Sequence, residues 1–220
     1  MFDLGWAQLT STTSNLRRTD SQGYDYTLVL PPAFGWALPT SAADAEPVIV
    51  GTNQSNFTQE IRLQSPNGSE HFHWTLGIYY SNLHQHDYET AAGPTYPQMT
   101  LANTGMTMQQ YFGEGLVDGN LTYISDQYIG DTQKAIFANA DYDIGAHFSV
   151  FGGARYENEE NTYRTVSDGA LAGGPSDITA TSKGHVTSPK AGVNWKIDDR
   201  TLVYFSAAKG SRPGGAGIPV

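Results

Sequence analysis

The sequence predicts an all-β chain: an antiparallel, up-and-down segment of a transmembrane β-barrel, with about seven strands, an incomplete barrel and long extracellular loops. Three observations lead to this prediction. Apolar and polar residues alternate with a period of two, which is the pattern of a strand with one apolar face. Aromatic residues lie near the ends of the apolar faces, as in the girdles of membrane barrels. The connections between the alternating segments are short and long in turn.

The composition favours strands and turns and excludes several classes of protein. The chain has 220 residues with 24 Gly and 13 Tyr, and no stretch approaches the ~20 consecutive apolar residues of a membrane-spanning helix. Without Cys it forms no disulfide and no thiolate metal site. The net charge of −10 argues against nucleic acid as a partner, because phosphate binding needs a basic face. No secretory signal follows Met1, so we expect an N-terminal part of a longer chain to be missing.

Seven segments are expected to be strands. In chain order they are 2–14, 57–64, 71–81, 135–144, 148–157, 188–197 and 200–208. The first should place Leu4 and Trp6 on one side. The last is strand-like but apolar on both faces, so its faces stay unassigned.

The apolar faces of the five middle segments are expected to contact lipid. Their members, in chain order, are Phe57, Gln59, Ile61 and Leu63; Phe72, Trp74, Leu76, Ile78 and Tyr80; Ile136, Ala138, Ala140, Tyr142 and Ile144; Phe148, Val150, Gly152, Ala154 and Tyr156; and Pro189, Ala191, Val193, Trp195 and Ile197. The residues expected in the lipid-facing surface and its girdles are Trp74, Ile78, Tyr80, Tyr142, Tyr156 and Trp195. The opposite faces carry charges, and Glu60, Arg62, Arg155 and Lys190 are expected to line the lumen.

The connections keep a consistent up-down order. Short turns are expected at 65–70, 144–147 and 197–200, and long polar stretches at roughly 17–53, 86–121 and 165–182. Long stretches without strand or helix pattern are unusual in compact soluble domains, whereas the extracellular loops of membrane barrels are long. Loops often carry function, so their aromatic residues are weak ligand-binding candidates. These are Phe34, Trp36, Tyr96, Tyr111 and Phe112.

Two His-x-His pairs are the remaining polar candidates. His71 and His73 share one strand face, as do His84 and His86, so chelation is geometrically possible. The pairs lie too far apart to form a single site, and a polar lining role is the favoured interpretation. We therefore predict no metal site, and His84 and His86 are the better ligand candidates because they face the long-loop side.

Three motifs resemble TonB-dependent receptors of the outer membrane. FTQEIRLQSP at 57–66 is followed by WTLGIYYS at 74–81. AIFANADYDIGAHFSVFGGARY at 135–156 is similar to a hairpin of that family, and SPKAGVNWKIDDRTLVYFSAAKGSRPGG at 188–215 is similar to a later one. The resemblance spans roughly residues 54–215. It implies that residues 1–220 are a partial β-barrel domain, because the plug domain and the N-terminal TonB-contacting box of these receptors are not recognisable and family barrels have about 22 strands.

The resemblance also implies a function. The chain is expected to be part of a transporter that takes up an iron–siderophore complex, cobalamin or an oligosaccharide. Its partners would be the TonB–ExbB–ExbD complex, outer-membrane lipid and a small nutrient ligand, in the outer membrane of a Gram-negative bacterium. No enzyme activity and no cofactor are expected. The alternative is a soluble β-sandwich for binding or adhesion without transport. An outer-membrane enzyme is less favoured, since no Ser–His pairing stands out.

Overall fold

The computed structural model describes residues 1–37, 45–66, 68–69 and 71–210. All strands in this part of the chain belong to one antiparallel sheet, in the order β1-β2-β3-β4-β5-β6-β7-β8. The strands are β1 (Phe2–Asp3), β2 (Gln8–Asp25), β3 (Pro47–Gln64), β4 (Phe72–Ala92), β5 (Leu121–Ile144), β6 (Phe148–Asp168), β7 (Ser176–Asp198) and β8 (Thr201–Ala208). The helices are α1 (Leu30–Ala33), α2 (Tyr96–Thr104), α3 (Met108–Phe112) and the 3-10 turn η2 (Ala170–Ala172).

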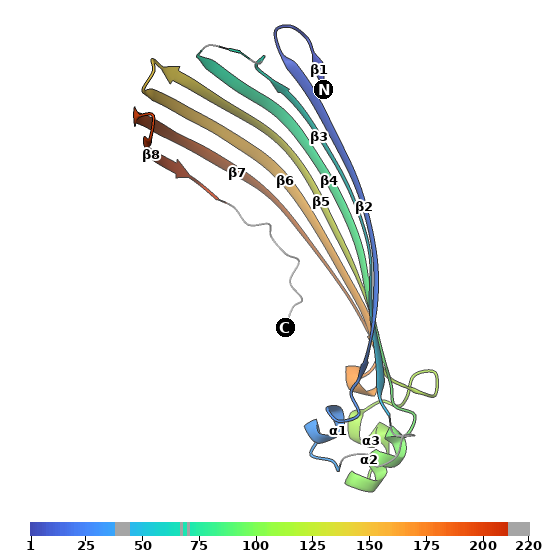
Figure 1. Ribbon diagram of the computed structural model, residues 1–220. Coiled ribbons are helices and arrows are strands. Elements are labelled where there is room, and N and C mark those ends of the chain that lie inside the picture. Colours follow the sequence, from blue (N-terminus) through green and yellow to red (C-terminus); the bar gives the residue numbers. More distant parts are fainter. Residues whose placement is uncertain (38–44, 67, 70, 211–220) are drawn as a thin grey trace.

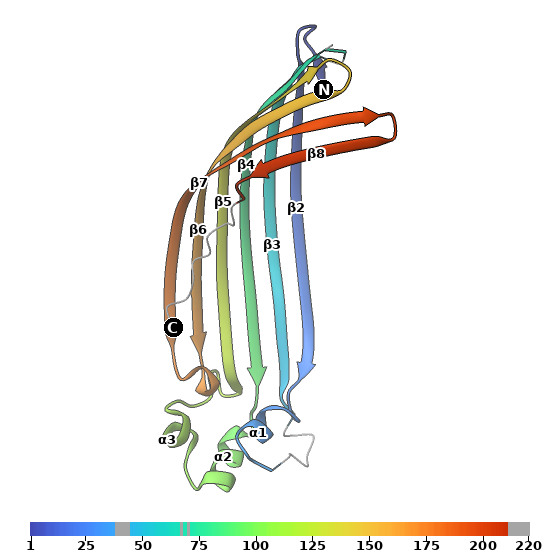
Figure 2. The ribbon, with the colours of Figure 1, turned by 90° about the vertical axis from the view of Figure 1, so that its left-hand side faces the viewer.

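The predicted fold class is confirmed. Each strand pairs with its neighbours in sequence, and the sheet is curved but open, with its helices gathered at one end and its short turns at the other (Figures 1 and 2). No second sheet covers the strands in the described ranges, so the β-sandwich alternative is wrong. Ile78 is 53% exposed and Trp195 is 45% exposed, as side chains that face lipid rather than a protein core should be.

The register aligns the apolar residues of neighbouring strands. Ile78 pairs with Ile61 on one side and with Ile136 on the other, and Ile136 pairs with Tyr156. Successive side chains of a strand point to opposite faces, so this row defines one face, which we call the outward face. The row that contains Arg62 and Arg155 lies on the other face, which we call the inward face.

The opening strand was predicted wrongly. Residues 2–14 do not form one strand, because the backbone turns between β1 and β2. The Leu4 N–H donates to the Ala7 carbonyl at 2.8 Å, and Gly5 adopts a φ of 81°, which favours glycine. Leu4 and Trp6 therefore lie in a turn rather than on a strand face. The separate strand β1 also makes eight strands where seven were expected.

The strands are also much longer than predicted. β2 to β7 have 18 to 24 residues, whereas about 9–11 tilted residues cross a bilayer. Most of 165–182, predicted as a loop, is strand apart from a connection between β6 and β7. Each long hairpin thus continues well past the apolar region, with polar side chains on both faces.

The register also assigns the last strand. Val203 and Phe205 of β8 lie opposite Trp195 and Val193, so they belong to the outward face. The end of the third motif, from residue 211 on, falls outside the described residues. None of the described helices is long and apolar enough to span a membrane.

Candidate functional site

The outward face carries an apolar belt bounded by aromatic rings. Near the short turns, Phe148 and Trp195 stack with ring centroids 5.7 Å apart. At the other boundary Phe57 and Tyr80 are 6.3 Å apart. The segment 148–156 of β6 is about 27 Å long, which at a barrel tilt of about 40° gives a height of about 20 Å, close to the apolar band of membrane barrels.

The six residues predicted for the lipid-facing surface and its girdles all lie on this face. Their positions follow from the register: Trp74, Ile78 and Tyr80 alternate along β4, and their partners on β5, β6 and β7 have the same orientation. A continuous hollow lined by side chains such as Ile61, Ile78 and Ile136 crosses the belt. This surface is suited to acyl chains, since it contains almost no hydrogen-bonding group.

The inward face carries a polar groove at the same height. Its volume is about 490 Å³, and Glu60, Arg62, Arg155 and Lys190 all line it. Arg62 donates a hydrogen bond to Glu60, and Arg155 forms an ion pair with Glu157. The four residues predicted to line the lumen therefore share the inward face.

Aromatic rings on the inward face lie over neighbouring strands. The Arg155 guanidinium lies 5.0 Å from the centre of the Tyr79 ring, a cation–π contact. The Phe137 ring covers Gly77 so closely that a Cβ at that position would lie 2.2 Å from the ring. A ring over a strand glycine fills the gap left by the missing side chain. The wall of the groove is therefore packed by side chains from β4, β5 and β6.

The loops at the far end pack into one small domain-like unit, which we call the loop head (residues 26–37, 45–46, 93–120 and 169–175). Its core contains Trp36, Tyr96, Met108 and Ala170, with Phe34 and Phe112 packed against it. Trp36 lies between 5.2 and 6.0 Å, centroid to centroid, from the rings of Phe34, Tyr96, Tyr111 and Phe112. The expectation of loops without helix pattern was wrong, because α1, α2, α3 and η2 all lie here.

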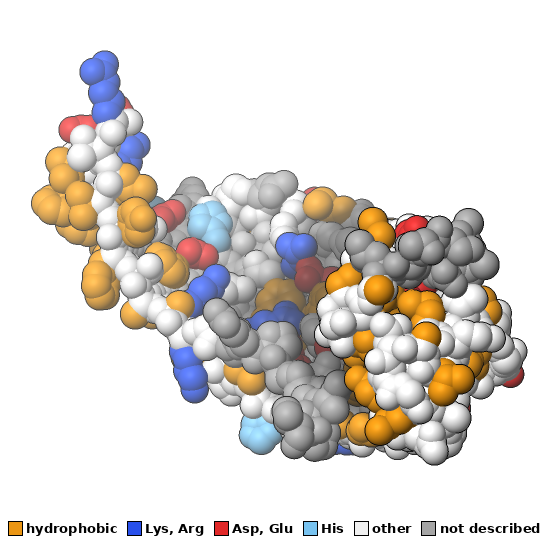
Figure 3. Space-filling view, turned by 90° about the horizontal axis from the view of Figure 1, so that it is seen from below, with side chains coloured by type: hydrophobic (Ala, Val, Ile, Leu, Met, Phe, Trp, Pro, Cys, Tyr) orange, Lys and Arg blue, Asp and Glu red, His pale blue; other side chains and the backbone are white. Residues whose placement is uncertain are grey.

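This packing changes the interpretation of the loop aromatics. Trp36 and Tyr96 are buried, and Phe34 and Phe112 are half-buried, so these four side chains mainly hold the loop head together. Tyr111 is exposed and remains a predicted ligand contact. Apolar side chains are exposed on the loop head, which is seen from its own end in Figure 3. Its exposed apolar residues are Leu28, Val29, Leu101, Met106 and Tyr111.

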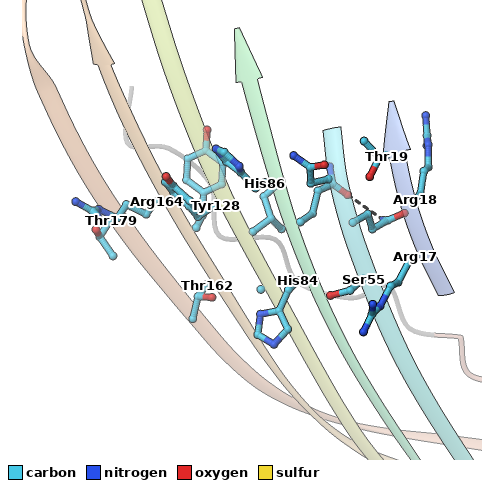
Figure 4. Close-up of a pocket in the computed structure, with 16 residues that line it drawn as sticks. Arg17, Arg18, Thr19, Ser55, His84, His86, Tyr128, Thr162, Arg164 and Thr179 are labelled. Atoms are coloured by element: carbon cyan, nitrogen blue, oxygen red, sulfur yellow. Dashed lines mark hydrogen bonds between the residues drawn. The ribbon is translucent and has the colours of Figure 1, made fainter. Parts of the chain in front are cut away.

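The histidine pairs face opposite sides of the sheet. His73 shares the inward face, whereas His84 and His86 share the outward face with Ile78, so they do not face the lumen as ligand contacts there would. His86 stacks on Tyr128 with centroids 4.6 Å apart (Figure 4). His86 also pairs with Asp126 at 2.6 Å. The described residues contain no group of three or more possible metal ligands.

Comparison with known proteins decides the family. The family model described as "TonB dependent receptor-like, beta-barrel" matches residues 2–219. The chain belongs to the TonB-dependent receptor family. Its fold is similar to the crystal structure of the ferric yersiniabactin uptake receptor FyuA from Yersinia pestis, with a TM-score of 0.65 and 14% sequence identity. The match covers 97% of this chain and 27% of that one, so the chain spans about a quarter of that receptor.

The family assignment bears on two further predictions. TonB-dependent receptors are transporters and not enzymes, which confirms the prediction that this chain has no catalytic role. The open sheet of this TonB-dependent receptor chain matches a part of the family barrel, as the fold prediction stated.

A buried carboxyl group was missed by the sequence analysis of this receptor chain. Glu46 is 1% exposed, and neither its carboxylate oxygens nor the Tyr96 hydroxyl has a hydrogen-bond partner among the described residues. Burial raises the pKa of Glu46 to about 7; the nearby Tyr96 hydroxyl works against this rise and the charge of Asp25 adds to it. Burial also raises the pKa of Tyr96. A lone Glu in a polar loop gives no sequence signal of burial.

The loop head should therefore become less stable as the pH rises. The folded head favours neutral Glu46, so its stabilisation is complete below the ordinary carboxyl pKa of 4.5 and is lost as the pH rises through about 7. The loss is at most about 3 kcal/mol. Hydrogen exchange of 93–120, corrected for intrinsic rates, should be faster at pH 8 than at pH 5, and Glu46→Gln should remove most of this difference. Glu114→Gln, in the same head, should leave it unchanged; an equal effect of both variants would contradict the prediction.

Proposed function

We propose that the chain forms part of the barrel wall and external loops of an outer-membrane transporter for TonB-dependent uptake of a small nutrient, in a Gram-negative bacterium. The observation that carries the proposal is that the two faces of the sheet differ at the same height. The outward face carries an apolar belt about as tall as the hydrocarbon layer, and the inward face carries a charged groove. Only a wall between hydrocarbon and a hydrated lumen needs both faces at one depth.

The surfaces of the inward groove and of the loop head indicate a different role for each. The inward groove lines the lumen, where paired charges such as Arg62 and Glu60 keep the wall hydrated without attracting one ion strongly. The exposed apolar side chains of the loop head are the first candidates for ligand contact, since a nutrient arriving from outside meets the loops first. Among the nutrient classes, an iron–siderophore complex is the first to test, with cobalamin and an oligosaccharide as the others.

One uptake experiment tests both the dependence on TonB and the class of ligand. The full-length protein that carries this chain is expressed in a strain without its own receptors, and uptake of radiolabelled ferric siderophores, cobalamin and oligosaccharides is measured with and without TonB. Uptake of one class should depend on TonB and stop when the proton gradient is collapsed, while the amount of receptor in the outer membrane stays equal. Uptake that is independent of TonB, or a receptor absent from the outer membrane, would overturn the proposal.

The loop head should contribute to ligand affinity. Met106→Glu places a charge in the exposed apolar patch and should raise the KM for uptake about tenfold, which is the effect of losing roughly 1.4 kcal/mol of binding. Glu114→Gln, in the same connection, serves as the matched control. An unchanged KM in Met106→Glu would show that the exposed apolar patch of the loop head is not part of the ligand site.

A further inference from the structure

The loop head carries almost no charge. Its described residues include no Lys, Arg or His, and their acidic members are Glu46, Glu114 and Asp118. Glu46 is buried, so Glu114 and Asp118 are the acids that remain near the surface. Proteins usually hold an anion with charge-assisted hydrogen bonds from Arg or Lys. An anionic ligand therefore finds no such partner in the described part of the head.

The large exposed side chains of the head are apolar. Leu28 and Val29 come from the connection after β2, and Leu101, Met106 and Tyr111 come from the connection after β4. Hydrophobic and uncharged polar side chains make up most of the end of the head that is seen in Figure 3. Met106 adds an unbranched, polarizable side chain that adapts to the shape of an apolar partner. This patch binds by covering apolar surface and offers a ligand no charge.

The inward face between the head and the polar groove is acidic. On β3 this stretch runs from Val48 to Glu60, about 40 Å along the strand. The acidic side chains that the register places on it from β4, β5 and β6 include Asp87, Glu89, Asp131 and Glu159. Among the described residues of this stretch the only basic side chain is Arg18, which pairs with Asp20 at 3.1 Å. A wall lined by one sign of charge repels ions of that sign.

The acidic wall does not form a cation site. Asp87 accepts hydrogen bonds from Thr52 and Gln85, one on each of its two carboxylate oxygens. In the described parts of the chain no three His, Asp or Glu side chains are grouped as metal ligands would be. The apolar patch of the head is itself uncharged, so it supplies no carboxylate to a cationic ligand. The contact surface thus fits an uncharged ligand better than an ion of either sign.

We infer that the ligand of this receptor is an uncharged molecule with a largely apolar surface, and that the head and the acidic inward face select against anions. This inference deepens the proposed function, on which it rests. Among the nutrient classes it favours cobalamin or an uncharged iron–siderophore complex, in which hydroxamate groups balance the charge of the iron. It excludes anionic catecholate complexes. It also disfavours an oligosaccharide, because the hydroxyl groups of a sugar find few hydrogen-bond partners on the patch.

The first test measures the charge preference of uptake. The full-length receptor is expressed in a strain without its own receptors. The radiolabelled probes are an uncharged ferric tris-hydroxamate complex, uncharged cyanocobalamin and an anionic ferric tris-catecholate complex. One of the uncharged probes should be taken up, with TonB, at least about tenfold faster than the anionic probe. Its KM should stay constant between about 50 and about 300 mM salt, because screening acts on charged ligands.

The second test reads the sign of the ligand charge at the patch. Met106→Lys and Met106→Glu should both raise the KM of the transported probe about tenfold, because either charge must lose its hydration when the ligand covers it. A charged ligand would instead move the two KM values in opposite directions. The matched controls, Ser21→Lys and Ser21→Glu, place the same charges on the outward face of β2 and should leave the KM unchanged.

The results that would overturn the inference are faster uptake of the catecholate complex, a KM that changes with salt, and opposite effects of the two Met106 variants. Each of them requires TonB-dependent uptake, so the proposed function would stand. The amount of receptor in the outer membrane is measured in every variant. A receptor that inserts but takes up none of the probes would overturn the inference and the proposed function together.

Discussion

Leu76→Arg should prevent insertion of the barrel, whereas Thr75→Arg in the adjacent position should be tolerated. Leu76 lies in the outward belt between Leu63 and Ala138, and it is half exposed, as a lipid-facing side chain should be. An Arg near the bilayer midplane costs about 2–4 kcal/mol on the lipid face of a barrel. Thr75 lines the inward groove beside Asn139, where a guanidinium stays hydrated.

The two substitutions lie on the same strand at nearly the same depth and differ in the face of the sheet that they change. Heat-modifiable migration and protection from added protease measure the inserted fraction of the full-length receptor. We expect at least a tenfold lower inserted fraction for Leu76→Arg and a fraction close to that of the wild type for Thr75→Arg. If both variants failed equally, or if Leu76→Arg inserted normally, the assignment of the two faces would be wrong.

Trp36→Ala should open the loop head without unfolding the sheet. The indole is 7% exposed and lies between the rings of Phe34, Tyr96 and Phe112. Truncating a buried Trp costs about 3–5 kcal/mol through lost contacts and a cavity. That is enough to expose a small core that joins three separate connections, while β2 to β7 keep their backbone hydrogen bonds.

The measurement must separate the loop head from the wall. Limited proteolysis of Trp36→Ala should cut within 93–120 at least tenfold faster than in the wild type, with the inserted fraction unchanged. Trp36→Phe should be intermediate, because a smaller ring keeps part of the packing. Leu28→Ala, at a side chain that is 68% exposed, is the surface control and should behave like the wild type. Slow cleavage of Trp36→Ala would show that the head is held together by other contacts.

The wall was the part that the sequence predicted best. A strand with lipid on one side and water on the other has a strict period of two, so Ile78 and Arg62 could be assigned to opposite faces without coordinates. The short turns were also visible, because residues such as Gly145 meet a local backbone requirement, here a φ of 67°. The exception was the start, where Leu4 and Trp6 fit the period but Gly5 turns the chain.

The candidate site was predicted less completely. Beyond the belt both faces meet water, so the strand extensions that carry His86 and Tyr128 have no apolar period to detect. His84 and His86 were expected on the long-loop side, and only the continuous register of β4 shows which face of the sheet they occupy. The burial of Glu46 could not be read from a polar loop sequence.

The sequence by itself determined that the chain forms antiparallel hairpins with a lipid face and a lumen face, because alternation and turn chemistry are local properties of the residues. Only the tertiary structure decided how far the strands extend past the membrane, and that Trp36, Tyr96 and Met108 meet in one core. Strand length and the loop-head core both depend on contacts between segments that are far apart in the chain. No local sequence pattern identifies which segments come together. Backbone pairing between neighbouring strands lengthens the sheet whatever the polarity of its side chains, and burial of a few aromatic rings joins the loops.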